Sequence, residues 1–291
     1  LPNPSVCWLL TRASFEGTPL VLHWHSDVLT DNQGVAMRAL YRFYRPLERM
    51  LLERAAAIIA TSSSYLQTSE SLKDYPEKCH VVPLGLDGAR VLSHAPEEQP
   101  DRPNDEPFEL LAIGRLTYYK GFGFLLRALA ELENVRLHIV GTGVLWKELH
   151  AIARELKVKR YVTFHGGLDD EALAGRLARC DCVCLPSTER TEAFGLVLLE
   201  AMAFGKPTIA TRVQGSGMSW VVRDGETGLL VPPRDVQALA DAIRTLQNDP
   251  ERCARLGESG RTRFEQHFAI GPSVDALRTV YERVTTPAVR Q

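Results

Sequence analysis

The chain has 291 residues, of which 45% are hydrophobic, so it can bury a substantial core and is longer than one typical domain. Its 34 basic and 36 acidic side chains nearly cancel, which excludes the broad basic surface that nucleic-acid binding requires. No apolar run approaches the roughly 20 residues that cross a bilayer, and the cysteines lack the paired spacing of a zinc site or a disulfide framework. We therefore expect a two-domain cytoplasmic protein that acts on small molecules.

Short apolar, β-branched runs alternate with helical stretches along the whole chain. The predicted strands are 19–24, 57–61, 80–84, 108–113, 136–141, 161–164, 181–186 and 207–211. Such alternation is typical of parallel sheets that helices cover on both faces. The sequence therefore predicts an α/β fold with two Rossmann-like domains.

The domain boundary is expected between the third and fourth predicted strands. Residues 93–107 are rich in proline and acidic side chains and show no apolar periodicity, which is typical of a linker. We place an N-terminal domain at 1–95, a linker at 96–107 and a C-terminal domain at 108–270. We expect the closing segment 271–291 to form a helix that crosses back onto the N-terminal domain, because it carries an apolar stripe at helical spacing.

Two features of the N-terminal half are the way the sequence begins and a predicted helix that is rich in arginine. The opening Leu1-Pro2-Asn3-Pro4 reads like the middle of a domain, so we expect that an N-terminal segment is missing from this sequence. The stretch 37–54 places four arginines on one side of a predicted helix, namely Arg38, Arg42, Arg45 and Arg49. This side would be either a solvated basic face or a peripheral contact with an anionic membrane, and Glu48 and Glu53 dilute its charge.

Two cations follow the predicted strand 108–113. Arg115 and Lys120 lie on the loop between this strand and the next helix, and parallel sheets bind ligands beyond the carboxyl ends of their strands. An arginine fork and a lysine point charge together can hold a diphosphate and neutralise the charge that builds on it as it departs. Taken alone, the two side chains also fit solvated cations of an ordinary loop.

Two carboxylates lie eight residues apart where a loop becomes an apolar helix. A helix that begins near Gly195 would present free N–H groups to a phosphate. Glu200 lies two turns further on, where a carboxylate can accept hydrogen bonds from both hydroxyls of a ribose. Glu192 precedes the helix. An exposed position on the helix is the alternative for Glu200.

The order of these motifs resembles glycosyltransferase family 4, which has the GT-B fold. The matching segments are His25-Ser26-Asp27, Gly114-Arg115 with Lys120-Gly121, Gly141-Thr142-Gly143, His165-Gly166-Gly167, Glu192 with Glu200, and 224–231. Each is weak alone, but the combination is specific and covers nearly the whole chain. The segment 214–220 departs from the Gly-Gly-x-x-Glu pattern of many members and, with Trp24-His25-Ser26-Asp27, is similar to enzymes that build O-antigen and other bacterial surface polysaccharides.

The resemblance implies a retaining, metal-independent transferase without a cofactor, which moves a hexose from a UDP- or GDP-linked donor to a saccharide or polyprenyl-linked saccharide. It would act in the cytoplasm, at the inner face of the cell membrane. The catalytic positions of the family fall on His25, Arg115, Lys120 and Glu192. The donor-binding positions fall on Gly114, Gly141, Gly143, Leu168, Phe194, Gly195, Leu196 and Glu200. His25 would lie across the cleft from the others, against the transferred sugar.

Two other functions fit much of the same pattern. One is a catalytically silent module that binds a nucleotide sugar, and the other is a non-transferase GT-B enzyme such as an epimerase or a phosphorylase. His25 opposite a full donor set favours transfer, and the sequence has no pyridoxal-binding lysine motif. It also lacks an Asp-x-Asp triplet for a divalent ion, so Arg115 and Lys120 would neutralise the diphosphate in place of a metal.

Overall fold

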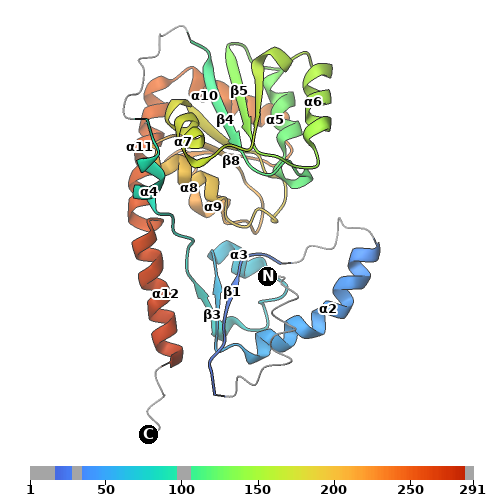
Figure 1. Cartoon of the computed structure of the whole chain (residues 1–291), viewed down its shortest axis with the longest axis vertical. Helices are drawn as coiled ribbons and strands as arrows, with labels where there is room; N and C mark the ends of the chain where they lie inside the picture. The colour runs from blue at the N-terminus through green and yellow to red at the C-terminus, as the bar shows by residue number, and fades with distance from the viewer. Residues whose placement is uncertain (1–16, 28–34, 97–105, 286–291) are drawn as a thin grey trace.

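The computed structural model describes residues 17–27, 35–96 and 106–285, which form two α/β units (Figure 1). The N-terminal unit has a three-stranded sheet in the order β1-β2-β3, and the C-terminal unit has a six-stranded sheet in the order β6-β5-β4-β7-β8-β9. Every strand pair within these sheets is parallel. The prediction of an α/β fold with two Rossmann-like sheets is confirmed.

The N-terminal sheet is small, and its central strand is completely buried. Its strands are β1 (Val21–Trp24), β2 (Ala57–Ala60) and β3 (Cys79–Val81), with the helices α2 (Val35–Arg54) and α3 (Ser63–Thr68) and the 3-10 turn η1 (Pro76–Lys78). β2 lies between the other two strands, which is why all four of its residues are apolar and buried. Trp24, Ile58 and Tyr65 fill one face of the sheet together with Leu51 and Leu52 of α2.

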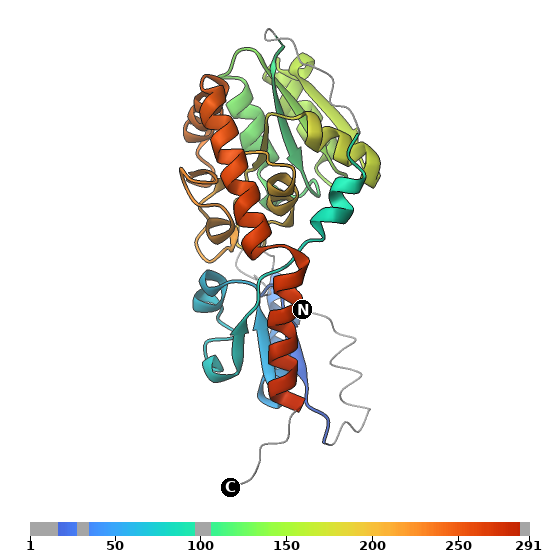
Figure 2. The ribbon, with the colours of Figure 1, turned by 90° about the vertical axis from the view of Figure 1, so that its left-hand side faces the viewer.

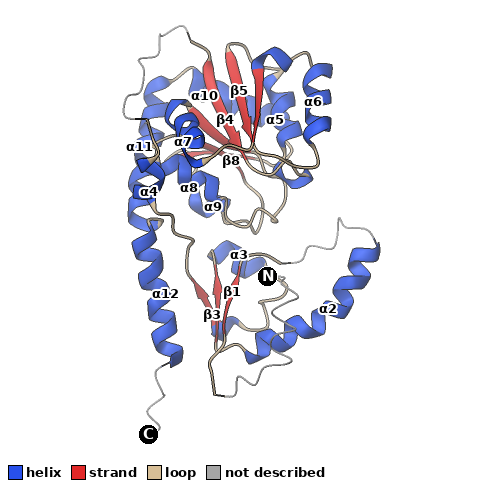
Figure 3. Ribbon diagram, in the orientation of Figure 1, coloured by secondary structure: helices blue, strands red, loops and turns tan. Residues whose placement is uncertain are grey.

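The C-terminal sheet is larger, and helices cover both of its faces (Figure 3). Its strands are β4 (Phe108–Ile113), β5 (Val135–Val140), β6 (Val162–Gly166), β7 (Cys182–Leu185), β8 (Thr208–Thr211) and β9 (Gly228–Val231). The helices are α5 (Phe122–Leu129), α6 (Trp146–Glu155), α7 (Asp170–Arg179), α8 (Leu196–Ala203), α9 (Met218–Val221), α10 (Val236–Gln247) and α11 (Pro250–His267), with the 3-10 turns η2 (Tyr118–Lys120) and η3 (Lys159–Tyr161). Alternate residues of β4 point to opposite faces of the sheet. Leu110 and Ala112 pack in the hydrophobic core on one face, and Leu111 packs in the core on the other face. Of these strands, β9 alone has no counterpart among the predicted ones.

The strand order reverses at the centre of the C-terminal sheet, between β4 and β7. From β4 the chain continues to β5 and β6 on one side, then returns to β7 and continues to β8 and β9 on the other. α/β sheets bind ligands in the crevice beyond the carboxyl ends of the strands at such a reversal. Cys182 and Cys184 are fully buried on β7, where they pack as small apolar residues.

Two segments connect the units, and they contact each other. The first, 82–87, leads from β3 into α4 (Gly88–Ser93), which packs against α7 and α8 of the C-terminal unit. The first crossing therefore precedes α4, while most of the proposed linker 96–107 lies outside the described residues. The second crossing follows α11, where the N–H of Leu86 donates to the carbonyl of Phe268 at 2.8 Å.

The last helix, α12 (Ile270–Thr285), returns to the N-terminal unit and lies along its sheet (Figure 2). Val280 is buried against Ala57, Ile59 and Val82 of that sheet. The hydroxyl of Ser273 donates to the carbonyl of Pro83 at 2.7 Å. The C-terminal helix therefore packs on the N-terminal unit and on the segment that leads out of it.

Helix α2 carries the arginines that the sequence places on one side, and all four are exposed. Glu48 is buried and accepts hydrogen bonds from Tyr41 and Ser71 at 3.0 and 2.8 Å, and it lines the same hollow as Arg42, Arg45 and Arg49. Leu40 and Phe43 are 64% and 80% exposed on a further flank of the helix. Among the described residues, no helix combines the length and apolar character needed to cross a bilayer.

Candidate active site

Lys120 and Glu192 meet at the point where the strand order reverses. Lys120 ends the turn that follows β4, and Glu192 lies on the loop that follows β7, so the adjacent strands bring them together. The Lys120 Nζ lies 2.5 Å from Glu192 Oε2, and the side chains are only 12% and 13% exposed. Ser187 also donates to the Glu192 carboxylate, at 3.2 Å. The structure thus places a nearly buried ion pair where the sheet binds ligands.

Glycines allow the loops after β4 and β5 to approach each other beneath this pair. Gly114 has φ +152°, and a Cβ there would lie 3.0 Å from the Cε and Nζ of Lys120. Gly141 has φ +139°, and a Cβ there would lie 2.0 Å from the carbonyl oxygen of Gly114. Gly143 packs in the same way against Leu116. These predicted donor-binding glycines therefore lie together, and any larger residue would displace Lys120 or separate the loops.

Arg115 lies next to this pair but is exposed, so it differs from Lys120 in its surroundings. It follows Gly114 at the end of β4, on the same loop. A flexible, solvated guanidinium at the edge of the crevice is free to fold onto an anionic ligand. The structure therefore brings Gly114, Lys120 and Glu192 together and leaves Arg115 at the entrance.

The loop that carries Glu192 continues into α8 through a strained turn. Gly195 has φ +83° and caps α8, which begins at Leu196 as the sequence predicts. Leu196 is exposed on the first turn of the helix. Phe194 is instead buried against Trp220 and Phe268, with ring centroids 6.1 Å from each. Only the backbone of Phe194 is therefore available to a ligand, and its ring fixes the start of the helix.

Glu200 is mostly buried on α8, so it does not lie at an exposed turn of the helix. Burial, with a further contribution from the neighbouring Asp170, raises the pKa of Glu200 to about 7, although Lys120 opposes the shift. The residue lines a cavity of about 260 Å³ between α4 and α7, together with Leu86 and Arg90. None of the described residues donates a hydrogen bond to its carboxylate. A carboxylate that is buried without a partner is poised to accept hydrogen bonds from a ligand.

The remaining predicted positions lie on two other loops. Leu168, between β6 and α7, packs against the core formed by α8 and β7. His25 follows β1 at the carboxyl end of the other sheet, and partial burial lowers its pKa, so the ring is neutral at pH 7. His23 lies nearby with its ring centroid 6.4 Å away, and it contacts Tyr281 of α12 rather than the cleft.

Sequence reasoning missed a contact between the two units that involves Arg190. This side chain leaves the loop after β7 and pairs with Asp27, two residues after His25, at 2.9 Å. Asp27 was part of a matching motif, but no chemistry was assigned to it. The only signal for Arg190 was its position two residues before Glu192, because a partner 163 residues away cannot be identified from one sequence.

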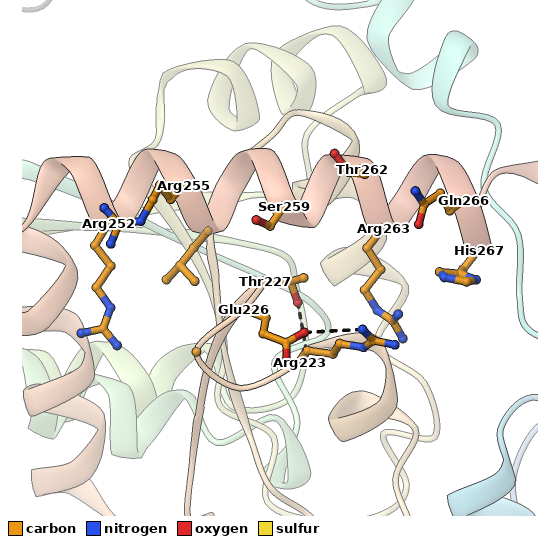
Figure 4. A pocket seen from close by; sticks show the side chains of 12 residues that line it. Arg223, Glu226, Thr227, Arg252, Arg255, Ser259, Thr262, Arg263, Gln266 and His267 are labelled. Carbon is orange, nitrogen blue, oxygen red and sulfur yellow. Dashed lines mark hydrogen bonds and ion pairs between the residues drawn. The ribbon is translucent and has the colours of Figure 1, made fainter.

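The motif 224–231 has a structural role in the turn before β9. The N–H of Arg223 donates to Thr227 Oγ1 at 2.9 Å, and the N–H of Leu230 donates to Asp224 Oδ1 at 2.8 Å. A hollow of about 490 Å³ separates this turn from α11 (Figure 4). Arg263 crosses it and donates to the carbonyls of Trp220 and Val221 at 2.7 and 3.1 Å. These hydrogen bonds give the motif a role in the folding of the C-terminal unit.

Three further side chains form a buried polar chain across β4, β5 and β6. Glu109 contacts His138, whose Nδ1 lies 2.8 Å from Nε2 of His165, and the two imidazole rings stack. Only His165 belongs to a matching motif, and its ring is turned into this chain. Across the part of the chain that the structure describes, no three His, Cys, Asp or Glu side chains converge as metal ligands would.

Comparison with known proteins agrees with this geometry. Residues 95–263, over half of the chain, match the family model described as glycosyl transferases group 1. Residues 1–85 match the model of a glycosyl transferase 4-like domain. The chain belongs to the group 1 glycosyltransferase family. Lys120, Glu192 and Glu200 lie within the first match.

Similar proteins include two bacterial sugar transferases. The chain is 34% identical over 261 residues to O-antigen chain mannosyltransferase C of Escherichia coli, covering 90% of this chain and 68% of that one. It is 36% identical over 251 residues to D-rhamnosyltransferase WbpZ of Pseudomonas aeruginosa, covering 86% and 64%. The chain thus spans about two thirds of the length of these two group 1 glycosyltransferases.

Solved structures of similar proteins confirm the predicted GT-B fold. Sucrose-phosphate synthase from Thermosynechococcus elongatus superimposes with a TM-score of 0.79 at 29% identity, covering 96% of this chain and 71% of that one. Anabaena HepE in complex with UDP superimposes with a TM-score of 0.73 at 25% identity, covering 92% and 72%. The two sheets of this group 1 glycosyltransferase are therefore the two halves of a GT-B fold.

Proposed function

We propose that this glycosyltransferase moves a hexose, with retention of configuration, from a UDP- or GDP-linked donor to a saccharide or polyprenyl-linked saccharide of the cell envelope. The observation that carries the proposal is the nearly buried Lys120–Glu192 pair at the strand reversal, with Glu200 following on α8. The relative named as an O-antigen chain mannosyltransferase supports the envelope role, the relative named as a D-rhamnosyltransferase supports hexose transfer, and the UDP bound to HepE supports a nucleotide donor.

Each side chain has a distinct task in this proposal. Lys120 and Arg115 bind the diphosphate and stabilise its charge as the glycosidic bond breaks. Glu200 accepts hydrogen bonds from the ribose, and Glu192 faces the hydroxyls of the transferred sugar. A donor phosphate oxygen takes the proton of the acceptor hydroxyl, so no protein base is required. His25, neutral at pH 7, lies against the sugar near the carbon that becomes positively charged.

Metal independence follows from the same assignment. In this proposal Arg115 and Lys120 neutralise the diphosphate, the task that a divalent ion has in a metal-dependent transferase. With UDP- and GDP-hexoses and saccharide acceptors, we expect product formation that keeps most of its rate in excess EDTA, measured by mass spectrometry. Complete loss that manganese or magnesium restores would contradict this assignment.

The same assay separates the proposal from its alternatives. Nuclear magnetic resonance of the product should show the anomeric configuration of the donor sugar. An altered free nucleotide sugar would identify an epimerase, and nucleotide binding without any product would identify a silent binding module. An inverted anomer would contradict front-face transfer.

We further propose that α2 contacts an anionic membrane, where a polyprenyl-linked acceptor would lie. Its exposed arginines complement anionic headgroups, and the exposed Leu40 and Phe43 would enter the acyl boundary. The protein should float with phosphatidylglycerol vesicles, and Phe43→Ser should lower the bound fraction several-fold, whereas Val144→Ser, also at an exposed apolar residue, should not. Equal flotation with neutral vesicles, or none at all, would refute the contact.

A further inference from the structure

Arg190 joins the two units although it belongs to a loop of the C-terminal one. Its Nη2 donates to Asp27 Oδ2 at 2.9 Å, and its Nη1 donates to the carbonyl of Thr68 at 2.6 Å. The guanidinium carbon lies 4.9 Å from the centre of the Tyr65 ring. The fork of the guanidinium thus bonds with two acceptors of the other unit and stacks on its aromatic side chain.

The acceptor Asp27 is held firmly within the N-terminal unit. Its carboxylate accepts from Trp24 Nε1 at 2.8 Å and from Ser69 Oγ at 2.7 Å, and its own N–H donates to the Tyr65 hydroxyl. The Asp27 and Arg190 side chains are 7% and 19% exposed. Removing one partner of such a pair leaves the other charge buried and unpaired, so the contact resists separation.

Further contacts between the units surround this pair. Ser64 Oγ donates to the carbonyl of Ser216 at 3.1 Å, and Ser216 Oγ in turn donates to the carbonyl of Glu192. Gly215 lies so close to Thr68 that a Cβ there would approach Thr68 Oγ1 to 2.3 Å. The loop after β8, which hydrogen-bonds to the Glu192 carbonyl through Ser216, is therefore fitted against α3 of the N-terminal unit.

The Arg190–Asp27 pair bears on the reaction because each partner lies close in sequence to a residue assigned to the site. Asp27 lies two residues after His25, and Arg190 lies two residues before Glu192. Each partner is thus fixed to a short segment that carries one of the groups facing the transferred sugar. A change in the distance between Asp27 and Arg190 moves His25 relative to Glu192.

We propose that Arg190 is a positioning residue for transfer: through Asp27 it sets the separation of His25 and Glu192 when the cleft is closed. This inference rests on the proposed function. Arg190 itself belongs to none of the motifs assigned to donor binding, so its loss should disturb the geometry of the reacting groups and leave nucleotide binding to the C-terminal unit intact.

The test is a comparison of turnover and nucleotide affinity in the same enzyme preparations. Arg190→Ala should lower kcat at least about 100-fold, because the units separate and the reacting groups move apart by more than the 1 Å that already costs about this factor. The Kd of the nucleoside diphosphate should stay within twofold, measured by calorimetry. Arg190→Lys should recover part of kcat, because an ammonium can bond to Asp27 but cannot serve both acceptors.

A double substitution and a matched control test the pairing itself. Arg190→Ala combined with Asp27→Ala should lower kcat no further than either change alone, since both remove one interaction. Arg234→Ala should leave kcat unchanged, because Arg234 pairs at 3.3 Å with Glu189 of the same unit. An unchanged kcat in Arg190→Ala would overturn the proposal. So would a parallel fall of kcat, nucleotide affinity and melting temperature, which indicates a purely structural role.

A readout that does not need activity separates this inference from the proposed function. Small-angle X-ray scattering of the nucleotide-bound protein should give a larger radius of gyration for Arg190→Ala than for the wild type. A wild type without transfer activity would refute the proposed function, while the larger radius would still establish that Arg190 holds the units together. Identical radii would overturn the inference whatever the activity.

Discussion

Lys120→Met should lower the turnover number by about 100- to 1000-fold, the loss that follows removal of one preorganised group that stabilises transition-state charge. Lys120 lies within 2.5 Å of Glu192, and both are almost excluded from water, where an electrostatic contact is stronger than at the surface. The charge on the leaving diphosphate increases as the glycosidic bond breaks. The ammonium should therefore affect kcat more than the KM of the donor.

A second substitution separates chemistry from folding in this prediction. Lys120→Met alone leaves the Glu192 carboxylate nearly buried without its cation, which lowers stability. Lys120→Met with Glu192→Gln removes both charges, so thermal stability should recover while turnover stays low. Lys147→Met, at an exposed lysine of α6, should leave both quantities unchanged. Full turnover in the double variant would show that the pair only supports the fold.

Glu200→Gln should stabilise the protein at pH 8 and weaken nucleotide binding. The folded pKa of Glu200 is raised to about 7 from an ordinary value of 4.5. An acid with a raised pKa is harder to ionise in the folded state, so it destabilises the fold increasingly as pH rises from about 4.5 through 7. The shift corresponds to about 3 kcal/mol at pH 8, and urea unfolding should show a gain of about 2–3 kcal/mol for the variant there and almost none near pH 4.5.

The affinity for the nucleotide should rise with pH, whereas the stability of the fold falls. The ribose hydroxyls donate hydrogen bonds, so they favour the ionised carboxylate. Wild-type affinity should therefore fall about tenfold between pH 8 and pH 6, because a pKa near 7 leaves most Glu200 protonated at pH 6. In Glu200→Gln the remaining pH dependence is that of the nucleotide phosphate alone. Parallel pH profiles of the two proteins by calorimetry would exclude Glu200 from the ribose site.

The sequence was sufficient to predict the sheets, because apolar runs follow local rules. Side chains that follow parallel strands lie at one edge of a sheet, so Lys120 and Glu192 were both expected in the ligand site, but the sequence did not show that their strands are neighbours. The burial of the Glu200 side chain was not predictable, because α4 and α7, which cover it, come from other parts of the chain. Motif matching could not distinguish the folding role of 224–231 from a ligand role.

The contact between Arg190 and Asp27 shows a different limit. Its partners are 163 residues apart and lie on loops of separate units, so no periodicity or spacing relates them. The pairing depends on how the units pack, and that packing depends in part on α12 returning to the first sheet. Such long-range contacts require the three-dimensional arrangement of the whole chain.

The two crossings between the units also define how the cleft can open. Leu86 and Ala269 form a parallel bridge, and the Leu86 N–H donates to Phe268, so both crossings run together as one seam. Two units whose chain crossings run together along one seam rotate about it as about a hinge, while sliding and twisting are restrained. A rotation of a few degrees hardly moves atoms near the seam and moves those opposite it in proportion to their distance. A bend at Leu86 and Phe268 can therefore open the GT-B cleft only when the contact between Arg190 and Asp27 is broken.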